Sequence, residues 1–363
     1  MDTPPTILFQ PPNHIGLGHI NRLAAIALAL REMPNPVRPV FVVEGSSHLL
    51  LDVLNLPSIP LPSDHAMFET DLWNSWSADE RFTLSKEISQ GILRTVRPQL
   101  VVFDCFPNPQ FARVVFEEKI PTILCLREMR DINRYLNHIG DMLGQIGHII
   151  LPHDAGALEL PDPIRMKSCF VGEIIRFRRK HEAPPKSAER SVVVCGGGGG
   201  YPGTVSFYNL AMKALTELQH LRPKVTCRLI AGPLFQYWSK LQLAAGVSVT
   251  PFEPDMIGAF SAADLVVSAA GYNACAELEQ LGARAILVPA ERQWDDQYAR
   301  ARRLAHTYSH FKVFTGPSPQ DLANLMHRAL EETIDIHMEA PMNGAWRAAE
   351  AIRAILERRR PLV

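Results

Sequence analysis

A histidine and an aspartate follow two apolar runs of the sequence, and together they predict acid–base chemistry. His19 comes shortly after the run at residues 6–10, in the first turn of an expected helix, where the helix dipole favours the neutral, proton-accepting imidazole. Asp104 directly follows the run at residues 100–103. Because parallel strands share a carboxyl edge, we expect Asp104 to orient His19, the general base, and to stabilise its imidazolium. The structural alternatives are a histidine without a catalytic role and an aspartate that caps the next helix.

Five consecutive glycines predict a loop that binds phosphate groups. They follow the apolar run at residues 191–195 and precede a helical pattern that begins near Thr204. Glycines at this point add no packing and cost backbone entropy, but they let backbone N–H groups approach an anion at a helix N-terminus. We therefore expect a phosphate or diphosphate to be bound by Gly196, Gly197, Gly198, Gly199 and Gly200.

The same loop does not favour a nicotinamide dinucleotide. Gly198, Gly200 and Gly203 satisfy the spacing G-x-G-x-x-G, which alone is a weak signal. A dinucleotide fold also needs an acid at the end of the next strand, and the run at residues 226–231 is followed by Gly232 instead. The loop also lacks the Gly-Lys-Ser/Thr sequence of a P-loop.

Polar side chains after two later runs predict contacts with sugar hydroxyls. Glu277 lies six residues beyond Gly271 on an expected helix, where a carboxylate can accept two hydrogen bonds from a ribose diol. Asp296 and Gln297 follow the run at residues 285–288 and offer acceptors and donors suited to a hexose. Each acid alone would be interpreted as a helix cap or a solvated face. With the glycines they describe one ligand that contains a diphosphate, a ribose and a hexose.

The elements that must position these residues alternate between short β-branched runs and longer helical patterns, which predicts an α/β fold with parallel sheets. The expected strands are residues 6–10, 39–43, 100–103, 122–126, 148–151, 191–195, 226–231, 264–268 and 285–288. Residues 179–190 are charged, contain a Pro-Pro pair and predict a linker. We expect two doubly wound, Rossmann-like domains, residues 1–178 and 191–340, that face each other across a ligand cleft, followed by an amphipathic helix at residues 341–363.

The stretch at residues 57–82 is rich in proline, acids and aromatics and predicts a long loop with a short helix. Trp73 and Trp76 lie among its acids. Such a loop would suit a cationic or amphipathic small acceptor, such as an amine-bearing natural product, through ion pairing and cation–π contact. The alternative is that these acids are only solvated.

Composition narrows the class of protein. The 363 residues carry 37 basic and 38 acidic side chains, so the net charge of −1 argues against a general nucleic-acid binder. The sequence contains no secretory signal and no apolar run long enough to span a membrane, which predicts a cytoplasmic protein. None of the six cysteines forms a C-x-x-C motif, so we expect core thiols and neither disulfides nor zinc.

These motifs resemble the nucleotide-sugar glycosyltransferases of the GT-B fold, in particular the MurG-like, UDP-glycosyltransferase-like and family 28 types, across nearly the whole chain. The resemblance implies that His19 is the catalytic histidine and Asp104 the acid that orients it. It implies that the donor is bound by Gly196–Gly200, Phe252, Met256, Gly271, Asn273, Glu277, Asp296 and Gln297. Gly18, Trp73 and Trp76 are expected on the acceptor side, and the final helix is expected to return to the N-terminal domain.

Two features depart from these families. The Trp-x-x-Gln opening of the plant signature is absent, and Ala269 or Ala270 stands where that signature has its phosphate-binding histidine. Phosphate binding is therefore expected to depend on the backbone amides of residues 196–203. No D-x-D motif follows a strand, so no metal and no other cofactor are expected.

The sequence thus predicts an inverting, metal-independent glycosyltransferase that moves a sugar from UDP or TDP to a hydroxyl of a small acceptor, as a monomer or homodimer. Gly16-Leu-Gly-His-Ile-Asn-Arg22 is also similar to the Gly-x-Gly-His-x-x-Arg motif of the nucleotide-sugar hydrolase of pseudaminic acid synthesis, in which the histidine acts with water. A hydrolase, an epimerase on the same fold and a non-catalytic nucleotide-sugar binder are the alternatives.

Overall fold

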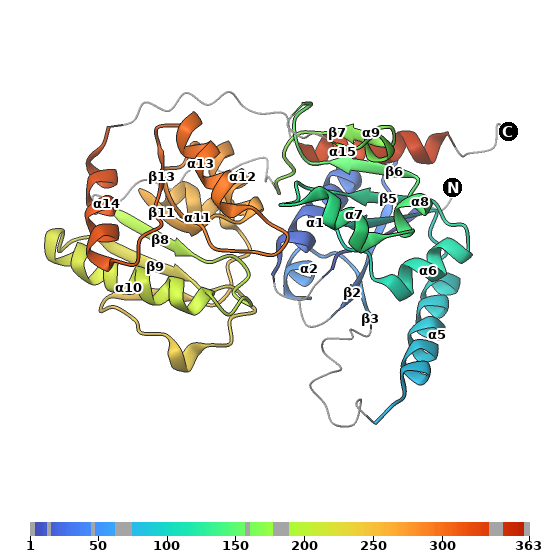
Figure 1. Ribbon diagram of the computed structural model, residues 1–363, viewed down its shortest axis with the longest axis horizontal. Helices are drawn as coiled ribbons and strands as arrows, with labels where there is room; N and C mark the ends of the chain where they lie inside the picture. Colours follow the sequence, from blue (N-terminus) through green and yellow to red (C-terminus); the bar gives the residue numbers. More distant parts are fainter. Residues whose placement is uncertain are drawn as a thin grey trace. The chain divides into compact units, whose positions relative to one another are not determined.

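The computed structural model describes most of the chain as two compact units (Figure 1). The described residues are 4–12, 16–44, 48–61, 75–156, 160–176, 189–333 and 344–358. The first unit comprises Met1–His14, His19–Arg176 and Met342–Val363, and the second comprises Ile15–Gly18 and Phe177–Pro341. Each unit contains one sheet, and the prediction of an α/β fold is confirmed.

The first unit contains a seven-stranded parallel sheet in the order β3-β2-β1-β4-β5-β6-β7. The strands are β1 Thr6–Gln10, β2 Arg38–Glu44, β3 Ser58–Leu61, β4 Leu100–Asp104, β5 Thr122–Cys125, β6 His148–Leu151 and β7 Ser168–Phe170. The helices are α1 Gly18–Glu32, α2 Leu49–Val53, α5 Ala78–Val96, α6 Pro109–Glu117, α7 Ile132–Ile139, α8 Met142–Gln145, α9 Asp162–Arg165 and α15 Gly344–Glu357. The strand order reverses between β1 and β4, and open α/β sheets bind ligands beyond the carboxyl ends of the strands at such a point.

The final helix, α15, belongs to the first unit. Ala345, Ala348 and Ile352 are fully or almost fully buried on it. The Gly344 amide donates to the carbonyl of Glu173 at 3.1 Å, and a Cβ at position 344 would lie only 2.4 Å from that oxygen. A larger residue at the start of the helix would therefore force the two segments apart.

The second unit contains a six-stranded parallel sheet in the order β10-β9-β8-β11-β12-β13, with its reversal between β8 and β11. The strands are β8 Ser191–Cys195, β9 Thr226–Ile230, β10 Val247–Thr250, β11 Leu265–Ala269, β12 Ala285–Val288 and β13 Phe311–Val313. The helices are α10 Thr204–Leu221, a short 3-10 turn η1 Trp238–Lys240, α11 Met256–Ala262, α12 Tyr272–Leu281, α13 Gln297–Thr307 and α14 Pro319–Glu331. The helices α10 and α14 cover one apolar cluster and α11, α12 and α13 the other, so the sheet is buried on both faces.

Four strands were not predicted, and one helix is longer than expected. β3, β7, β10 and β13 are the edge strands of the two sheets, and most of their residues are partly exposed, so they lack the continuous apolar run that predicted the inner strands. The predicted long loop at residues 57–82 is wrong at its start, where β3 lies, and the short helix expected within it is the beginning of the longer helix α5. Residues 62–74 of this stretch lie outside the described residues. Ser77 accepts from the Glu80 amide and Glu80 accepts from the Ser77 amide, a capping box that stabilises the first turn of α5.

All six cysteines are free thiols, and five are buried, as expected for core residues. Among the described residues, no helix is both long enough and apolar enough to cross a membrane.

Candidate active site

His19 and Asp104 meet at the point where the first sheet reverses its order. His19 is the second residue of α1, which follows β1, and Asp104 is the last residue of β4. His19 Nδ1 lies 2.9 Å from Asp104 Oδ1. An ionised carboxylate only accepts hydrogen bonds, so Nδ1 carries the proton and donates it to Oδ1. Nε2 is then the ring nitrogen left to accept a proton. The His19 side chain is 25% exposed, whereas Asp104 is fully buried.

Arg22 bonds the same carboxylate. It lies three residues after His19 on α1 and is 2% exposed. Its Nε donates to Asp104 Oδ2 at 2.8 Å and its Nη2 donates to Oδ1 at 2.7 Å. This two-point pairing fixes the plane of the carboxylate, and with it the oxygen that faces the imidazole.

The charges of the three side chains determine their protonation. Burial alone would raise the pKa of Asp104, but Arg22 and His19 outweigh it and hold that pKa well below its usual range. Burial lowers the pKa of His19; Asp104 opposes this shift, and the cations of Arg22 and Arg127 add to it. Asp104 is therefore ionised and His19 is a neutral base at neutral pH.

Cys105 completes the cluster but does not make it a metal site. Donor atoms of His19, Asp104 and Cys105 lie within 4.8 Å of one another. Burial raises the pKa of the Cys105 thiol to about 12, and the Arg22 guanidinium occupies both oxygens of Asp104. A divalent ion would have to displace the buried guanidinium of Arg22 and remove the proton of the Cys105 thiol, whose pKa is raised. These residues therefore do not fit a metal.

Further polar side chains lie at the same sheet edge and were missed in the sequence. The side chain of Asn108 donates through Nδ2 to Glu44 Oε1 at 2.9 Å, and the backbone N–H of Asn108 donates to Gln10 Oε1 at 2.9 Å. His153 Nε2 accepts from the Glu128 amide at 2.8 Å. Each of these residues ends a strand or follows one within four residues, which is the signal that could have found them.

In the second unit, the glycine loop follows β8 and leads into α10. Gly199 has a φ of +86°, and a Cβ there would lie 2.5 Å from the Ala231 carbonyl oxygen, so only glycine fits. The Gly196 amide donates to the Tyr208 hydroxyl at 3.0 Å, and the Gly197 amide contacts Cys195 Sγ at 3.4 Å. These two amides therefore serve the fold, and the binding of a phosphate by this loop stays a prediction.

The start of α12 lies beyond the neighbouring strand, β11. Gly271 is the N-cap residue of α12, and Asn273 is the second residue of the helix. The side-chain oxygen of Asn273 is buried and has no hydrogen-bond partner among the described residues. Glu277 is 4% exposed and close enough to Cys195, at the end of β8, to help raise the pKa of that thiol. The expected ribose acceptor thus lies beside the glycine loop.

The predicted sugar-binding pair has structural contacts of its own. Asp296 caps α13 by accepting from the Ala299 amide at 2.9 Å, and Gln297 accepts from the Ala290 amide at 3.0 Å. Asp295 Oδ1 is bonded at 2.6 Å to Arg300, which also donates to the Ala270 carbonyl at 2.8 Å. Arg300, which sequence reasoning missed, therefore joins the turn after β11 to the loop after β12.

The remaining predicted residues are more scattered. Phe252 lies in the loop after β10, and Met256 is the first residue of α11. Gly18 is the first residue of α1. Trp76 is 41% exposed just before α5, and Trp73 lies outside the described residues.

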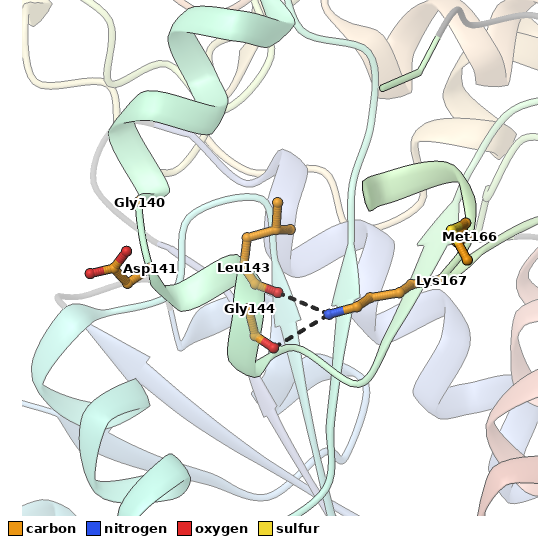
Figure 2. A pocket seen from close by; sticks show the side chains of 6 residues that line it. All are labelled: Gly140, Asp141, Leu143, Gly144, Met166 and Lys167. Carbon is orange, nitrogen blue, oxygen red and sulfur yellow. Dashed lines mark hydrogen bonds between the residues drawn. The ribbon is translucent and has the colours of Figure 1, made fainter. Parts of the chain in front are cut away.

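A separate hollow of about 560 Å³ lies in the first unit, between the end of α9 and α8 (Figure 2). Its lining residues are Gly140, Asp141, Leu143, Gly144, Met166 and Lys167. Lys167 Nζ donates to the carbonyls of Leu143, Gly144 and Ile146 at 3.3, 3.4 and 2.9 Å. Both segments precede strands β6 and β7, so the hollow lies at the amino edge of the sheet, away from His19.

One family model matches most of the second unit and part of the final helix. Residues 192–353 match the glycosyltransferase family 28 C-terminal domain. A UDP-N-acetylglucosamine–N-acetylmuramyl-(pentapeptide) pyrophosphoryl-undecaprenol N-acetylglucosamine transferase of Halorhodospira halophila is 32% identical over 174 residues, 45% of each chain. The enzyme of the same name from Aromatoleum aromaticum is 28% identical over 285 residues, 74% of each chain. The chain thus spans from under half to three quarters of the length of these two relatives.

Solved structures share the fold over nearly the whole chain. The glycosyltransferase of kitacinnamycin gives a TM-score of 0.62 at 15% identity, covering 98% of this chain and 100% of that one. Acinetobacter baumannii MurG gives 0.59 at 14% identity, with the same coverage. A structure from Listeria monocytogenes, described as a UDP-N-acetylglucosamine 2-epimerase, gives a TM-score of 0.64 at 11% identity, covering 98% of this chain and 96% of that one. The predicted GT-B fold, with two Rossmann-like domains, is confirmed.

Proposed function

We propose that this chain, a GT-B protein of the glycosyltransferase family 28 type, is an inverting glycosyltransferase that uses a nucleotide diphosphate sugar and needs no metal. The observation that carries the proposal is the arrangement of the partly exposed His19 with the buried Asp104 and Arg22 at the reversal point of the first sheet. It supplies a neutral base in a chain whose other unit has a family 28 C-terminal domain. The proposal assigns proton transfer to the first unit and donor binding to the second.

The chemistry follows from the bonds of His19. Its Nε2 accepts the proton of an acceptor hydroxyl as the hydroxyl oxygen attacks the anomeric carbon of the donor sugar. The new bond forms on the face opposite the bond from carbon to phosphate oxygen, which breaks, so the configuration inverts. The nucleoside diphosphate leaves with the electron pair of that bond, and Asp104 stabilises the imidazolium through Nδ1.

Donor binding rests on groups at the carboxyl ends of β8, β11 and β12. Backbone amides of the glycine loop meet the diphosphate, and Glu277 accepts from the ribose hydroxyls. Asp296 keeps one carboxylate oxygen for a sugar hydroxyl while the other caps α13. The names of the relatives make UDP-N-acetylglucosamine the first donor to test.

The acceptor is proposed to be a small molecule with a hydroxyl group. One acid of the stretch that suggested a cationic acceptor, Glu80, accepts hydrogen bonds in the capping box of α5, and these bonds lower its pKa and keep it negatively charged. The relatives named above act on an undecaprenol-linked acceptor, so this class belongs in the same assay.

The deciding experiment incubates the protein with UDP-N-acetylglucosamine and other UDP- and TDP-sugars, each with and without acceptor mixtures, and follows products by mass spectrometry. A new glycoside that forms only with acceptor supports the transferase. Free sugar released at full rate without acceptor would show instead the hydrolase that the Gly16-x-Gly18-His19-x-x-Arg22 motif resembles. Binding without conversion would identify a nucleotide-sugar binder, and loss of His19 would then leave that binding intact.

A further inference from the structure

Arg292 is stacked on an aromatic ring that adjoins the glycine loop. It lies in the loop after β12, and its Cζ is 3.2 Å from the centroid of the Tyr201 ring. Tyr201 directly follows Gly200, and its hydroxyl donates to the Glu291 carbonyl at 3.4 Å. The guanidinium is thus held beside the loop by contacts from both segments.

The Tyr201 ring also packs against the backbone that leads into α10. A Cβ at position 203 would lie 2.7 Å from Cε1 of Tyr201, so the ring packs directly on the backbone of Gly203. Stacking uses the face of the guanidinium, and in its plane Nη1 donates to the Glu291 carbonyl at 3.4 Å. A guanidinium carries five N–H donors, so it can bond several oxygen atoms at the same time.

A diphosphate at this loop needs more charge than the loop supplies. Neither residues 196–204 nor residues 268–271 contain lysine or arginine. The amides of Gly196 and Gly197 are already bonded within the fold. Arg300 is close to the turn after β11, but it is paired at 2.6 Å with Asp295, which balances its charge.

We propose that Arg292, positioned by Tyr201, is a donor-binding residue that donates hydrogen bonds to the diphosphate of the nucleotide. The inference rests on the proposed function, because it names the cation that the donor site uses. The sequence predicted that backbone amides alone bind the phosphates, and this inference adds the positive charge of the Arg292 side chain.

Calorimetry with UDP and with uridine tests the inference. Arg292→Met removes the charge and keeps most of the length, and we expect UDP to bind roughly 10- to 100-fold more weakly, the loss typical of one charge-assisted contact. Uridine has no phosphate, so its affinity should not change. Arg292→Lys should retain part of the UDP affinity, and Tyr201→Leu should weaken UDP through loss of the stack. Arg302→Met, an exposed arginine on α13, is the matched control and should bind both ligands normally.

The outcomes separate this inference from the proposed function. UDP binding by Arg292→Met at wild-type strength would overturn the role of Arg292 and leave the transferase proposal standing. Equal weakening of UDP and uridine would show that Arg292 only maintains the fold, a result that thermal melting of the variants would check. A wild-type protein that bound neither UDP nor TDP would overturn both proposals together.

Discussion

Asp104 Oδ1 accepts from two partners at once, His19 Nδ1 at 2.9 Å and Arg22 Nη2 at 2.7 Å. The carboxylate is therefore shared between the base and a permanent cation. With a neutral imidazole the three side chains have no net charge, and with an imidazolium they have a net charge of +1. The arrangement orients His19 firmly but stabilises its protonated form less than a carboxylate alone would.

Replacing the base should affect turnover much more than folding. His19→Ala is expected to lower kcat by about 10²–10⁴, the range for loss of a general base. Asp104→Asn should also lower kcat, because an amide can present either a donor or an acceptor to Nδ1 and no longer fixes the tautomer. Initial rates with saturating donor measure the effect, and circular dichroism checks the fold. Normal turnover by folded His19→Ala would refute the mechanism.

Arg22 should determine the pH range in which His19 works. Its cation lowers the pKa of His19, so Arg22→Met should raise that pKa. Because the base must be neutral, the acid limb of the kcat/KM profile should move to higher pH. NMR titration of the His19 ring measures the same shift without turnover. Arg94→Met, an exposed change on α5, is the control, and an acid limb that stays in place in Arg22→Met would contradict the prediction.

The same charges make stability depend on pH. The pKa of His19 is lower in the folded protein than its ordinary value of 6.5, so the unfolded chain binds this proton first. The stability that neutral His19 provides is complete above pH 6.5 and is lost as the pH falls below it. We expect urea unfolding to show a smaller loss of stability from pH 7 to pH 5 for His19→Gln than for the wild type. Parallel losses in the two proteins would count against a lowered pKa.

Breaking the buried ion pair should cost stability at every pH near neutrality. Arg22→Met leaves Asp104 without its cation, and such changes typically cost about 3–5 kcal/mol. The double variant Arg22→Met/Asp104→Asn removes both charges and should recover part of that loss. Unfolding free energies of the wild type, the two single variants and the double variant give the coupling, and additive effects would show that the pair is not coupled.

Glu277 should distinguish ribose from deoxyribose. If its carboxylate accepts from both hydroxyls of the diol, UDP should bind more tightly than 2′-deoxy-UDP, and Glu277→Ala should reduce that preference. Glu277→Ala should also raise the donor KM roughly 10-fold or more. Glu217→Ala, on the exposed side of α10, is the control. A preference that survives in Glu277→Ala would place the ribose elsewhere.

Parts of the site were predictable because they depend on strand ends. His19 follows β1 and Asp104 ends β4, and the shared edge of a parallel sheet brings them into the contact that the structure shows, although their roles stay a prediction. Arg22 was recognised in the sequence only as the last residue of the Gly-x-Gly-His-x-x-Arg motif, and no contact with Asp104 was predicted for it. Its position three residues after His19 places both on one face of α1, but this spacing does not reveal which buried acid an arginine will meet.

Other features depend on tertiary packing and left little trace in the sequence. The stack of Arg292 on Tyr201 joins residues 91 positions apart, and no local periodicity encodes such a contact. Asp296 was predicted to bind a sugar, yet its side chain also caps α13. The sequence alone does not show that one carboxylate has both a capping contact and a predicted ligand contact. The edge strands β3, β7, β10 and β13 are partly exposed, so their sequences lack the apolar runs by which the inner strands were predicted.

The place of α15 in the first unit affects how the protein can be assembled during synthesis. The ribosome makes the whole second unit before it makes Ala345, Ala348 and Ile352, which the first unit buries. A nascent chain that ends before α15 therefore holds a first unit with an uncovered apolar surface, while the second unit already has all its strands. The second unit can complete its folding first, and the first unit must wait for the last helix to emerge.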